Sequence, residues 1–386
     1  MNRLLQDLRI VEVSAFVAAP LGGMTMAQMG ADVIRIDPIG GGIDHARWPV
    51  TRDGASLYWA GLNKAKRSLA LALDKPEGRD IARAVITAPG TGGGILLTNL
   101  PPLRGLDFAT LKAARDDLIM LRLTGNRDGS AAVDYTVNAA LGFPFITGPD
   151  GYDGPVNHVL PAWDAMTGFL AATAILAAER HRRLTGDGQL VELSLSDVGL
   201  AVAGHLGFIG EAVIEETQRG RFGNYVYGTF GRDFVARDGR RVMVLALTPR
   251  QWRSLVEATG LSGEFRNLEA RLGLYFNDEG DRWRGRQEIC DLLEAWISVR
   301  TLASVAAAFD ANKVMWGPYQ TFKELVADDQ RASRANPLFA DVEHPGIGTY
   351  PTPGSPVRFG GVEGVPPKAS PKLGEHTEEL LREFDL

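Results

Sequence analysis

The N-terminal part of the chain alternates between short apolar runs and segments whose apolar residues recur at helical spacing. Residues 9–13 and 32–36 are typical of buried strands, and residues 20–30 between them are expected to form a short helix. The same alternation continues with a helix at 76–86 and strands at 94–98 and 118–123. This βαβ rhythm predicts an open parallel sheet covered by helices.

The strongest helical pattern of the sequence lies at residues 162–184. Apolar residues recur there at the spacing of one helix face, basic residues occupy the last turn, and Gly186 is placed to end the helix. A strand is expected at 190–195, and a second long helix at 198–213.

The pattern changes after about residue 220. A chain of 386 residues is too long for one compact core, so two domains are expected. We place the smaller domain at 225–325 and the first domain at 1–224 and 326–386. The last segment is rich in proline and glycine, ends in a polar helix at 375–383, and is expected to pack on the first domain. Within the small domain a strand is expected near 241–247 and helices at 250–259, 286–298 and 301–310.

Composition narrows the class of protein. The chain has 45% hydrophobic and 23% charged residues, which is the ordinary range for a globular protein. Its formal net charge of -6 argues against nucleic acid or an anionic membrane as the main partner. The single cysteine, Cys290, cannot form an intrachain disulfide, and no Cys/His pair has zinc-ligand spacing. With neither a signal peptide nor a membrane-spanning run in the sequence, a soluble, cytoplasmic protein without a metal is predicted.

Three familiar motifs are missing from the sequence. There is no G-x-x-x-x-G-K-[ST] loop and no G-x-S-x-G elbow. The turn after the first strand, residues 14–20, lacks the G-x-G-x-x-G that a dinucleotide pyrophosphate requires. An enzyme with this sequence is therefore expected to need no bound metal, nicotinamide or ATP. Exchange of coenzyme A (CoA) between carboxylates meets this condition, because one thioester replaces another of similar energy.

Four stretches, in order along nearly the whole chain, resemble the class III CoA transferases, the family that includes formyl-CoA transferase and carnitine-CoA transferase. They are residues 8–20 with 30–37, 62–68, 183–189 running into Asp197, and 373–377. The resemblance implies an α/β fold: a large Rossmann-like domain with an open parallel sheet, built from both chain ends, and a smaller central α+β domain. It also implies an interlocked homodimer and an acyl-CoA substrate, with CoA present only as part of that substrate.

The resemblance assigns the catalytic nucleophile to Asp164. This residue begins the long helix that leads into the 183–189 stretch. A carboxylate there attacks the acyl-CoA thioester to give a mixed anhydride, and the freed thiolate then forms an aspartyl-CoA thioester. Taken without the family context, Asp164 would be interpreted as a plain helix N-cap. Most members have glycine immediately before this aspartate, whereas this chain has Trp163, which is expected to reshape or cover the acyl pocket.

The resemblance also indicates which residues contact CoA. The family uses backbone after the first strand and basic residues on nearby loops, and arginine and lysine suit the phosphates. Each basic residue taken singly could instead be a solvated surface charge, and Arg67 is favoured over Lys64 as a phosphate ligand. The matching positions are Phe16, Val17, Ala18, Arg47, Lys66, Arg67, Asn99, Arg104 and Tyr135.

Three further stretches, 22–26, 37–42 and 157–164, are similar to a subgroup that transfers CoA within one molecule. That similarity implies movement of CoA between the C1 and C4 carboxyls of mesaconyl-CoA. If the released diacid stays in a closed pocket, no second binding step is needed. Arg47 and His158 are candidates for holding its free carboxylate.

Three alternatives remain at this point. The first is intermolecular transfer, for example with succinyl-CoA as donor. The second is an α-methylacyl-CoA racemase, which needs a histidine near position 133, where this chain has Val133; His158 could substitute for it. The third is an acyl-CoA-binding protein without catalytic activity, in which Asp164 would be dispensable.

Overall fold

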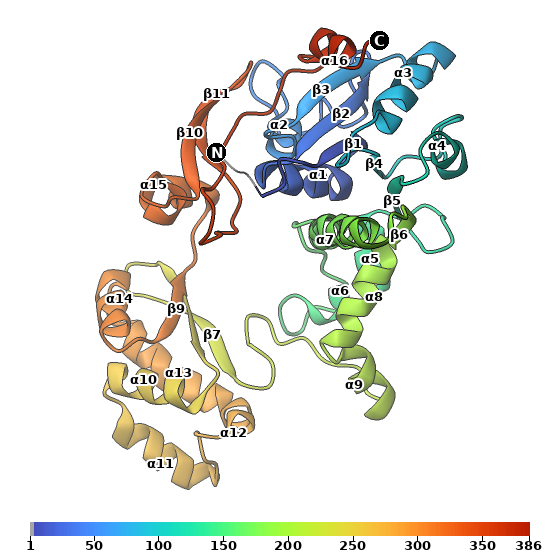
Figure 1. Ribbon diagram of the computed structural model, residues 1–386. Coiled ribbons are helices and arrows are strands. Elements are labelled where there is room, and N and C mark those ends of the chain that lie inside the picture. The colour runs from blue at the N-terminus through green and yellow to red at the C-terminus, as the bar shows by residue number, and fades with distance from the viewer. Residues whose placement is uncertain (1–3) are drawn as a thin grey trace. The chain divides into compact units, whose positions relative to one another are not determined.

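The computed structural model of the protein describes residues 4–386, which divide into two compact units (Figure 1). The large unit comprises the described residues up to Leu141, His158–Glu216 and Asp329–Leu386. The small unit comprises Gly142–Asn157 and Thr217–Asp328. The range 225–325 that the sequence indicated lies inside the small unit. The short excursion Gly142–Asn157, which carries helix α6 (Phe143–Ile146), was not foreseen.

A six-stranded parallel sheet forms the centre of the large unit, and it confirms the predicted fold class. Its strand order is β3-β2-β1-β4-β5-β6. Val11 pairs with Ile34 on one side and with Leu96 on the other. The strands are β1 (Arg9–Val13), β2 (Asp32–Pro38), β3 (Arg67–Leu71), β4 (Ile95–Thr98), β5 (Ile119–Thr124) and β6 (Leu190–Ser194).

Apolar side chains on both faces of this sheet are buried, which explains why its strands appear in the sequence as continuous apolar runs. Ile10 packs on one face, in a core shared with helices α1 (Ala18–Gln28) and α7 (Ala162–Thr185). Val11 packs on the opposite face, in a core shared with three other helices. These are α3 (Pro76–Thr87), α4 (Phe108–Ala114) and α16 (Thr377–Glu383).

Two glycines allow α1 and α7 to lie unusually close. A Cβ atom added at Gly168 in α7 would lie 2.8 Å from the carbonyl oxygen of Ala18 in α1. A Cβ atom added at Gly22 would lie 3.1 Å from the carbonyl oxygen of Gly168. Any larger side chain would separate the two backbones. The crossing therefore sets the first half of α7 against the first turns of α1, which directly follows the loop after β1.

The predicted long helix at 198–213 is wrong, because the structure divides it in two. Helix α8 (Leu195–His205) ends before Gly207, and α9 (Phe208–Ile214) follows at an angle of 63°. Gly207 has φ 83°, a left-handed conformation that interrupts a helix and that glycine adopts without strain. Among residues 4–386, no single helix is long and apolar enough to span a membrane. The α8–α9 pair meets that criterion only as a bent pair, as does α13–α14, helices of the small unit whose bounds follow below.

The remaining parts of the large unit are short. Helices α2 (Leu57–Leu62) and α5 (Asp134–Ala140) follow loops that leave the carboxyl ends of strands. Near the C-terminus a short 3₁₀ turn (Gln330–Ala332) precedes a hairpin of β10 (Phe339–His344) and β11 (Gly348–Pro353). The chain then returns to β3, where the His376 N–H donates to the Ser68 carbonyl at 3.0 Å.

The small unit has its own sheet and core. Its antiparallel strands are ordered β7 (Phe230–Val235), β8 (Arg241–Ala246) and β9 (Met315–Pro318). Large buried side chains such as Phe230, Trp252 and Phe309 fill the space between this sheet and the helices. The helices are α10 (Pro249–Thr259), α11 (Ser262–Leu272), α12 (Glu279–Arg284), α13 (Arg286–Ile297), α14 (Leu302–Ala311) and α15 (Phe322–Asp328).

Candidate active site

The strand order creates a switch point between β1 and β4, because the chain proceeds outward from these two strands in opposite directions. In open parallel sheets, ligands bind at the carboxyl ends of the strands beside such a point. Here the side chain of Asn99, just after β4, forms two hydrogen bonds with the backbone of Ala15, just after β1. The Ala15 N–H donates to Asn99 Oδ1 at 2.9 Å, and Asn99 Nδ2 donates to the Ala15 carbonyl at 2.8 Å. Asn99 therefore positions the loop that begins the candidate site.

Phe16 in this loop has φ 65°, an uncommon left-handed conformation for a bulky residue. Its N–H donates to Asp44 Oδ2 at 2.9 Å. Asp44 is 1% exposed and is held in turn by Arg35 Nη2 at 3.2 Å. The buried Arg35–Asp44 pair thus supports a strained backbone at the switch point. Strain of this kind is often found at ligand sites. The predicted contacts Val17 and Ala18 follow directly, as the N-cap and first residue of α1.

Lys66 belongs to a buried ionic network below this loop. Its Nζ donates to Glu12 Oε1 at 2.9 Å, to the Pro20 carbonyl at 2.9 Å and to Asn63 Oδ1 at 2.8 Å. Burial, only partly offset by Glu12, lowers the pKa of Lys66 to about 8. The same Glu12 oxygen accepts a hydrogen bond from Arg35. The Lys66 charge is therefore compensated inside the protein, and a contact of Lys66 with a CoA phosphate stays a prediction.

Arg67 and Arg104 have very different surroundings. Arg67 forms ion pairs with Asp32 and Glu383 at 2.5 Å and with Glu379 at 3.3 Å. It therefore fastens α16 to β2 and β3. Arg104 is exposed in the loop between β4 and α4, and among residues 4–386 it has no ion-pair partner. Of these two predicted CoA contacts, only Arg104 has a charge that is not neutralised by the protein.

Asp164 lies in the first turn of α7, and it is not the N-cap. The N-cap residue, Pro161, has no side-chain oxygen to offer. A carboxylate from another element takes over the capping: Asp134, at the start of α5, accepts the Trp163 N–H at 2.7 Å and the Asp164 N–H at 3.0 Å. The side chain of Asp164 is therefore not needed for capping. Within residues 4–386 its carboxylate accepts no hydrogen bond.

The pKa of Asp164 is raised from its ordinary value of 3.8 to about 7. Burial is the largest cause, the negative charge of Asp134 adds to it, and the positive charge of Arg47 opposes it. A carboxylate with little solvation and no hydrogen-bond donors is a better nucleophile than a solvated one. Perturbed carboxyl groups of this kind cluster at functional sites.

Asp134 also links the nucleophile to His158. Its Oδ1 lies 3.3 Å from His158 Nε2, while its Oδ2 binds the first turn of α7. The centroid of the His158 ring lies 6.2 Å from that of Tyr135 and 6.4 Å from that of Trp163. The Tyr135 hydroxyl donates to the Val159 carbonyl at 3.1 Å, which fixes the approach to the helix. The structure thus brings His158, Tyr135 and Asp164 into one group.

The side chain of Trp163 is turned into the protein. It is 4% exposed, and its Nε1 donates to Asn138 Oδ1 in α5 at 3.2 Å. The bulk that replaces the family's glycine is thus packed against α5.

Two residues of this group escaped the sequence analysis. Asp134 stands beside the position searched for a racemase histidine, and an acidic residue next to Val133 was the signal available in the sequence. Tyr58 gave no signal, because only folding brings it to Arg47. The Arg47 guanidinium lies 5.3 Å from the Tyr58 ring and 5.3 Å from the Phe16 ring.

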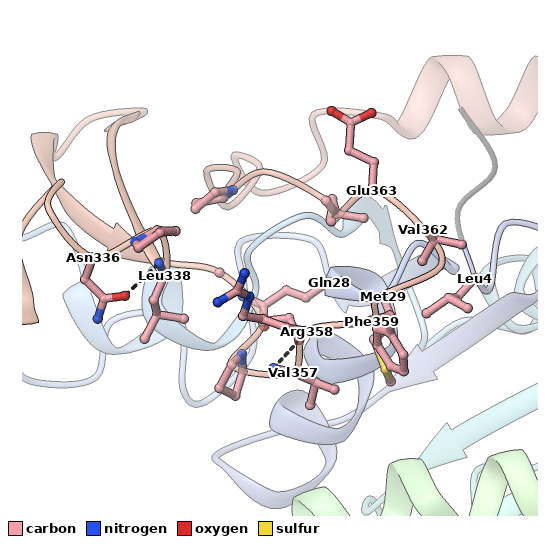
Figure 2. A pocket seen from close by; sticks show the side chains of 17 residues that line it. Leu4, Gln28, Met29, Asn336, Leu338, Val357, Arg358, Phe359, Val362 and Glu363 are labelled. Carbon is pink, nitrogen blue, oxygen red and sulfur yellow. Dashed lines mark hydrogen bonds between the residues drawn. The ribbon is translucent and has the colours of Figure 1, made fainter.

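A cavity of about 480 Å³ lies elsewhere in the large unit (Figure 2). It is formed by Leu4, the end of α1 at Gln28 and Met29, and the C-terminal segment 336–367. Asn336 stabilises its wall by accepting the Leu338 N–H at 3.1 Å. None of the predicted site residues lines this cavity, so its volume does not identify the reaction centre. In residues 4–386 no cluster of three or more His, Cys, Asp or Glu side chains is placed to hold a metal ion.

Comparisons with known proteins identify the family of the chain. Residues 5–377 match the model of CoA-transferase family III. The chain is 56% identical to 2-methylfumaryl-CoA isomerase of Chloroflexus aurantiacus, over 99% of this chain and 94% of that protein. It is 28% identical to succinate–glutarate CoA-transferase of Agrobacterium fabrum, over 99% and 96% of the two chains. The crystal structure of a CAIB/BAIF family protein from Brucella suis has a TM-score of 0.81 and 24% identity, covering 100% of both chains. The protein whose switch point and Asp164 are described above therefore belongs to CoA-transferase family III.

Proposed function

We propose that this protein moves CoA between the C1 and C4 carboxyls of mesaconyl-CoA, the reaction of a 2-methylfumaryl-CoA isomerase. The observation that carries the proposal is the 56% identity, over 99% of the chain, to a protein of that name. Identity to succinate–glutarate CoA-transferase, whose name describes exchange between two acids, is only 28%. The geometry around Asp164 supports the chemistry, because its carboxylate lies in the first turn of α7 and accepts no hydrogen bond from residues 4–386.

The proposed reaction conserves charge and needs no redox partner. An Asp164 oxygen attacks the thioester carbonyl, the C–S bond breaks, and a mixed anhydride and CoA thiolate result. The thiolate attacks the Asp164 carbonyl of the anhydride, which releases mesaconate and leaves an aspartyl-CoA thioester. The other carboxylate of mesaconate attacks this thioester to form the second anhydride. The thiolate, released again, attacks the substrate carbonyl, which yields the isomer and restores Asp164.

The raised pKa of Asp164 suits both halves of this sequence. A poorly solvated carboxylate attacks readily, and its hydrogen-bond-free oxygens lose no protein partner when the anhydride forms. Since each thioester is replaced by another of similar energy, the reaction requires no ATP, and we propose that no resident cofactor takes part. A homodimer with interlocked chains is proposed from family membership.

Trapping with hydroxylamine tests the covalent route. In the presence of mesaconyl-CoA, hydroxylamine should convert Asp164 to its hydroxamate, which mass spectrometry of the peptides locates. Asp164→Asn should lower kcat by a factor of about 10³ or more. Asp187→Asn, a change at an exposed aspartate beyond the end of α7, is the matched control and should keep full activity. Modification at another residue, or an active Asp164→Asn variant, would contradict the assignment.

Isotope exchange separates the intramolecular reaction from its alternative. With unlabelled mesaconyl-CoA and labelled free mesaconate, intramolecular transfer leaves the product unlabelled. Exchange between two acids, as the names of the 28%-identical relatives describe, would place label in the product at the rate of turnover.

A further inference from the structure

Arg47 differs from the other central arginines of the large unit in having aromatic contacts instead of acidic ones. The carbon of its guanidinium lies 5.3 Å from the centroid of the Phe16 ring and 5.3 Å from that of the Tyr58 ring, and Arg47 is exposed to solvent. Among residues 4–386 no carboxylate forms an ion pair with Arg47, whereas Arg35 and Arg67 are each paired with acidic side chains. A guanidinium has five N–H donors in one plane, and besides its interaction with the Tyr58 side chain Arg47 retains donors that match a carboxylate.

The surrounding loop holds Arg47 and Tyr58 in register. Ser56 Oγ donates to the Arg47 carbonyl at 2.5 Å and accepts the Trp59 N–H at 3.0 Å. The Arg47 N–H donates to the carbonyl of Asp44, whose carboxylate also holds the Phe16 N–H. The two rings and the guanidinium are therefore positioned before any ligand arrives, which lowers the entropy cost of binding one.

This group shares the electrostatic environment of the nucleophile. Arg47 lowers the pKa of Asp164, and Asp164 in turn raises the pKa of Tyr58. Burial is the largest cause of the Tyr58 shift, which reaches about 12, although Arg47 opposes it. The phenol therefore keeps its proton at any physiological pH and can act as a hydrogen-bond donor next to the guanidinium.

We propose that Arg47 and Tyr58 form the receptor for the carboxylate of the diacid that is bonded neither to CoA nor to Asp164. The inference rests on the proposed function and adds to it the feature that selects dicarboxylic acyl groups. Mesaconyl-CoA has one free carboxylate in either isomeric form, so a single receptor serves both. It also retains the free diacid after the thiolate has attacked, which favours intramolecular return over exchange with solution.

The test compares two substrates that differ only in this carboxylate. Tiglyl-CoA has a methyl group where mesaconyl-C1-CoA has its free carboxylate, and hydroxylamine trapping at Asp164 reports acylation by either substrate. Rates are measured at pH 9, above the Asp164 pKa of about 7 in the wild-type protein. For wild-type protein, the acylation rate constant divided by KM should be about 100-fold higher for mesaconyl-CoA than for tiglyl-CoA. This difference is expected because tiglyl-CoA lacks the charged group that accepts the hydrogen bonds.

Two variants should remove that preference. Tyr58→Phe should raise KM for mesaconyl-CoA about 10-fold, and Arg47→Gln should raise it further, with little change for tiglyl-CoA. Arg47→Lys should restore part of the preference, because lysine keeps the positive charge but lacks the paired N–H donors of a guanidinium. Both Tyr58→Phe and Arg47→Gln should allow labelled free mesaconate to enter the product. Arg52→Gln, in an exposed position of the same loop, is the control and should behave as wild type.

The outcomes separate this inference from the proposed function. If the variants lose the same factor in acylation rate over KM for both substrates, then Arg47 and Tyr58 act on Asp164 or on folding. This result would refute their proposed role as the carboxylate receptor. Loss of the preference in Tyr58→Phe alone, with an unchanged melting temperature, would still support it. Wild-type protein that acylates at Asp164 with neither substrate would instead refute the proposed function.

Discussion

Asp164 holds its proton to about pH 7 because burial and two charged neighbours act on it with unequal strength. Burial contributes most, Asp134 reinforces it, and Arg47 works against it. The charge that makes Asp164 nucleophilic is thus set by residues that do not themselves react.

The first prediction concerns the pH dependence of the reaction. The rate over KM should fall as pH drops below about 7, because protonated Asp164 cannot attack. Asp134→Asn removes a negative charge, so the acidic limb should move to lower pH without reaching 4, since burial remains. Arg47→Gln removes a positive charge, so the limb should move to higher pH. Rate profiles from pH 5 to 9 measure both shifts, and identical limbs in all three proteins would disprove the coupling.

The second prediction concerns stability. The pKa of folded Asp164, about 7, lies above the ordinary value of 3.8. Below pH 4 the group is neutral in both states, but between pH 4 and 7 only the unfolded chain ionises, so stability falls over that window. The penalty grows to about 4 kcal/mol above pH 7. Asp164→Asn should therefore gain stability relative to wild type as pH rises from 4 to 8. Urea unfolding at both pH values measures the gain, and a constant difference would contradict the prediction.

At the scale of single elements, the N-terminus of α7 depends on a carboxylate from α5. Asp134 accepts two backbone N–H groups that Pro161, lacking a side-chain oxygen, leaves without a cap. The nucleophile's helix is thereby fastened to α5, and the side chain of Asp164 remains available for chemistry.

The third prediction tests this capping. Asp134→Ala should destabilise the protein by about 1–3 kcal/mol, because two N–H donors lose their acceptor. Asp134→Asn retains an acceptor oxygen and should cost less than half as much. Val133→Ala, a change at an exposed neighbour, is the control and should stay within about 1 kcal/mol of wild type. Chemical unfolding measures all three, and equal losses for Ala and Asn would argue against the cap.

The fourth prediction concerns the crossing of α1 and α7. Gly168→Ala would bring its Cβ to 2.8 Å from a backbone oxygen, so the helices must separate. We expect a loss of about 1–3 kcal/mol and a lower kcat, because the loop after β1 would shift relative to Asp164. Gly210→Ala lies in α9, where a Cβ meets open space, and should be neutral or stabilising. Thermal melting and kcat together test the idea, and an undisturbed Gly168→Ala variant would refute it.

At the scale of the whole molecule, the site is assembled from segments far apart in the sequence. The loop after β1, the loop that carries Arg47, the start of α5 and the start of α7 all meet within the large unit. The strand order explains part of this arrangement, since the chain must change direction between β1 and β4. The identity of 24% to a structure with TM-score 0.81 shows that widely differing sequences adopt this fold.

Elements that depend on a local sequence pattern were predicted from the sequence, whereas elements whose pattern is interrupted or misleading were missed. Strands such as 9–13 and the helix at 162–184 were found because burial of one face leaves a local repeat in the sequence. The strand β3 was missed, because Arg67 and Ser68 interrupt its apolar run. The break at Gly207 was missed because the apolar pattern continues across it while the backbone turns.

The sequence by itself determined the βαβ order, the parallel sheet, the family and the aspartate that stands at the head of α7. These features depend on local periodicity or on residues in fixed order, both of which a linear chain displays. The tertiary structure alone decided what each charge does. Lys66 became a buried partner of Glu12, Asp134 became the cap of α7, and Arg47 came to lie near two aromatic rings. The physical reason is that the energy of a charge depends on its solvation and its neighbours in space, and folding supplies both.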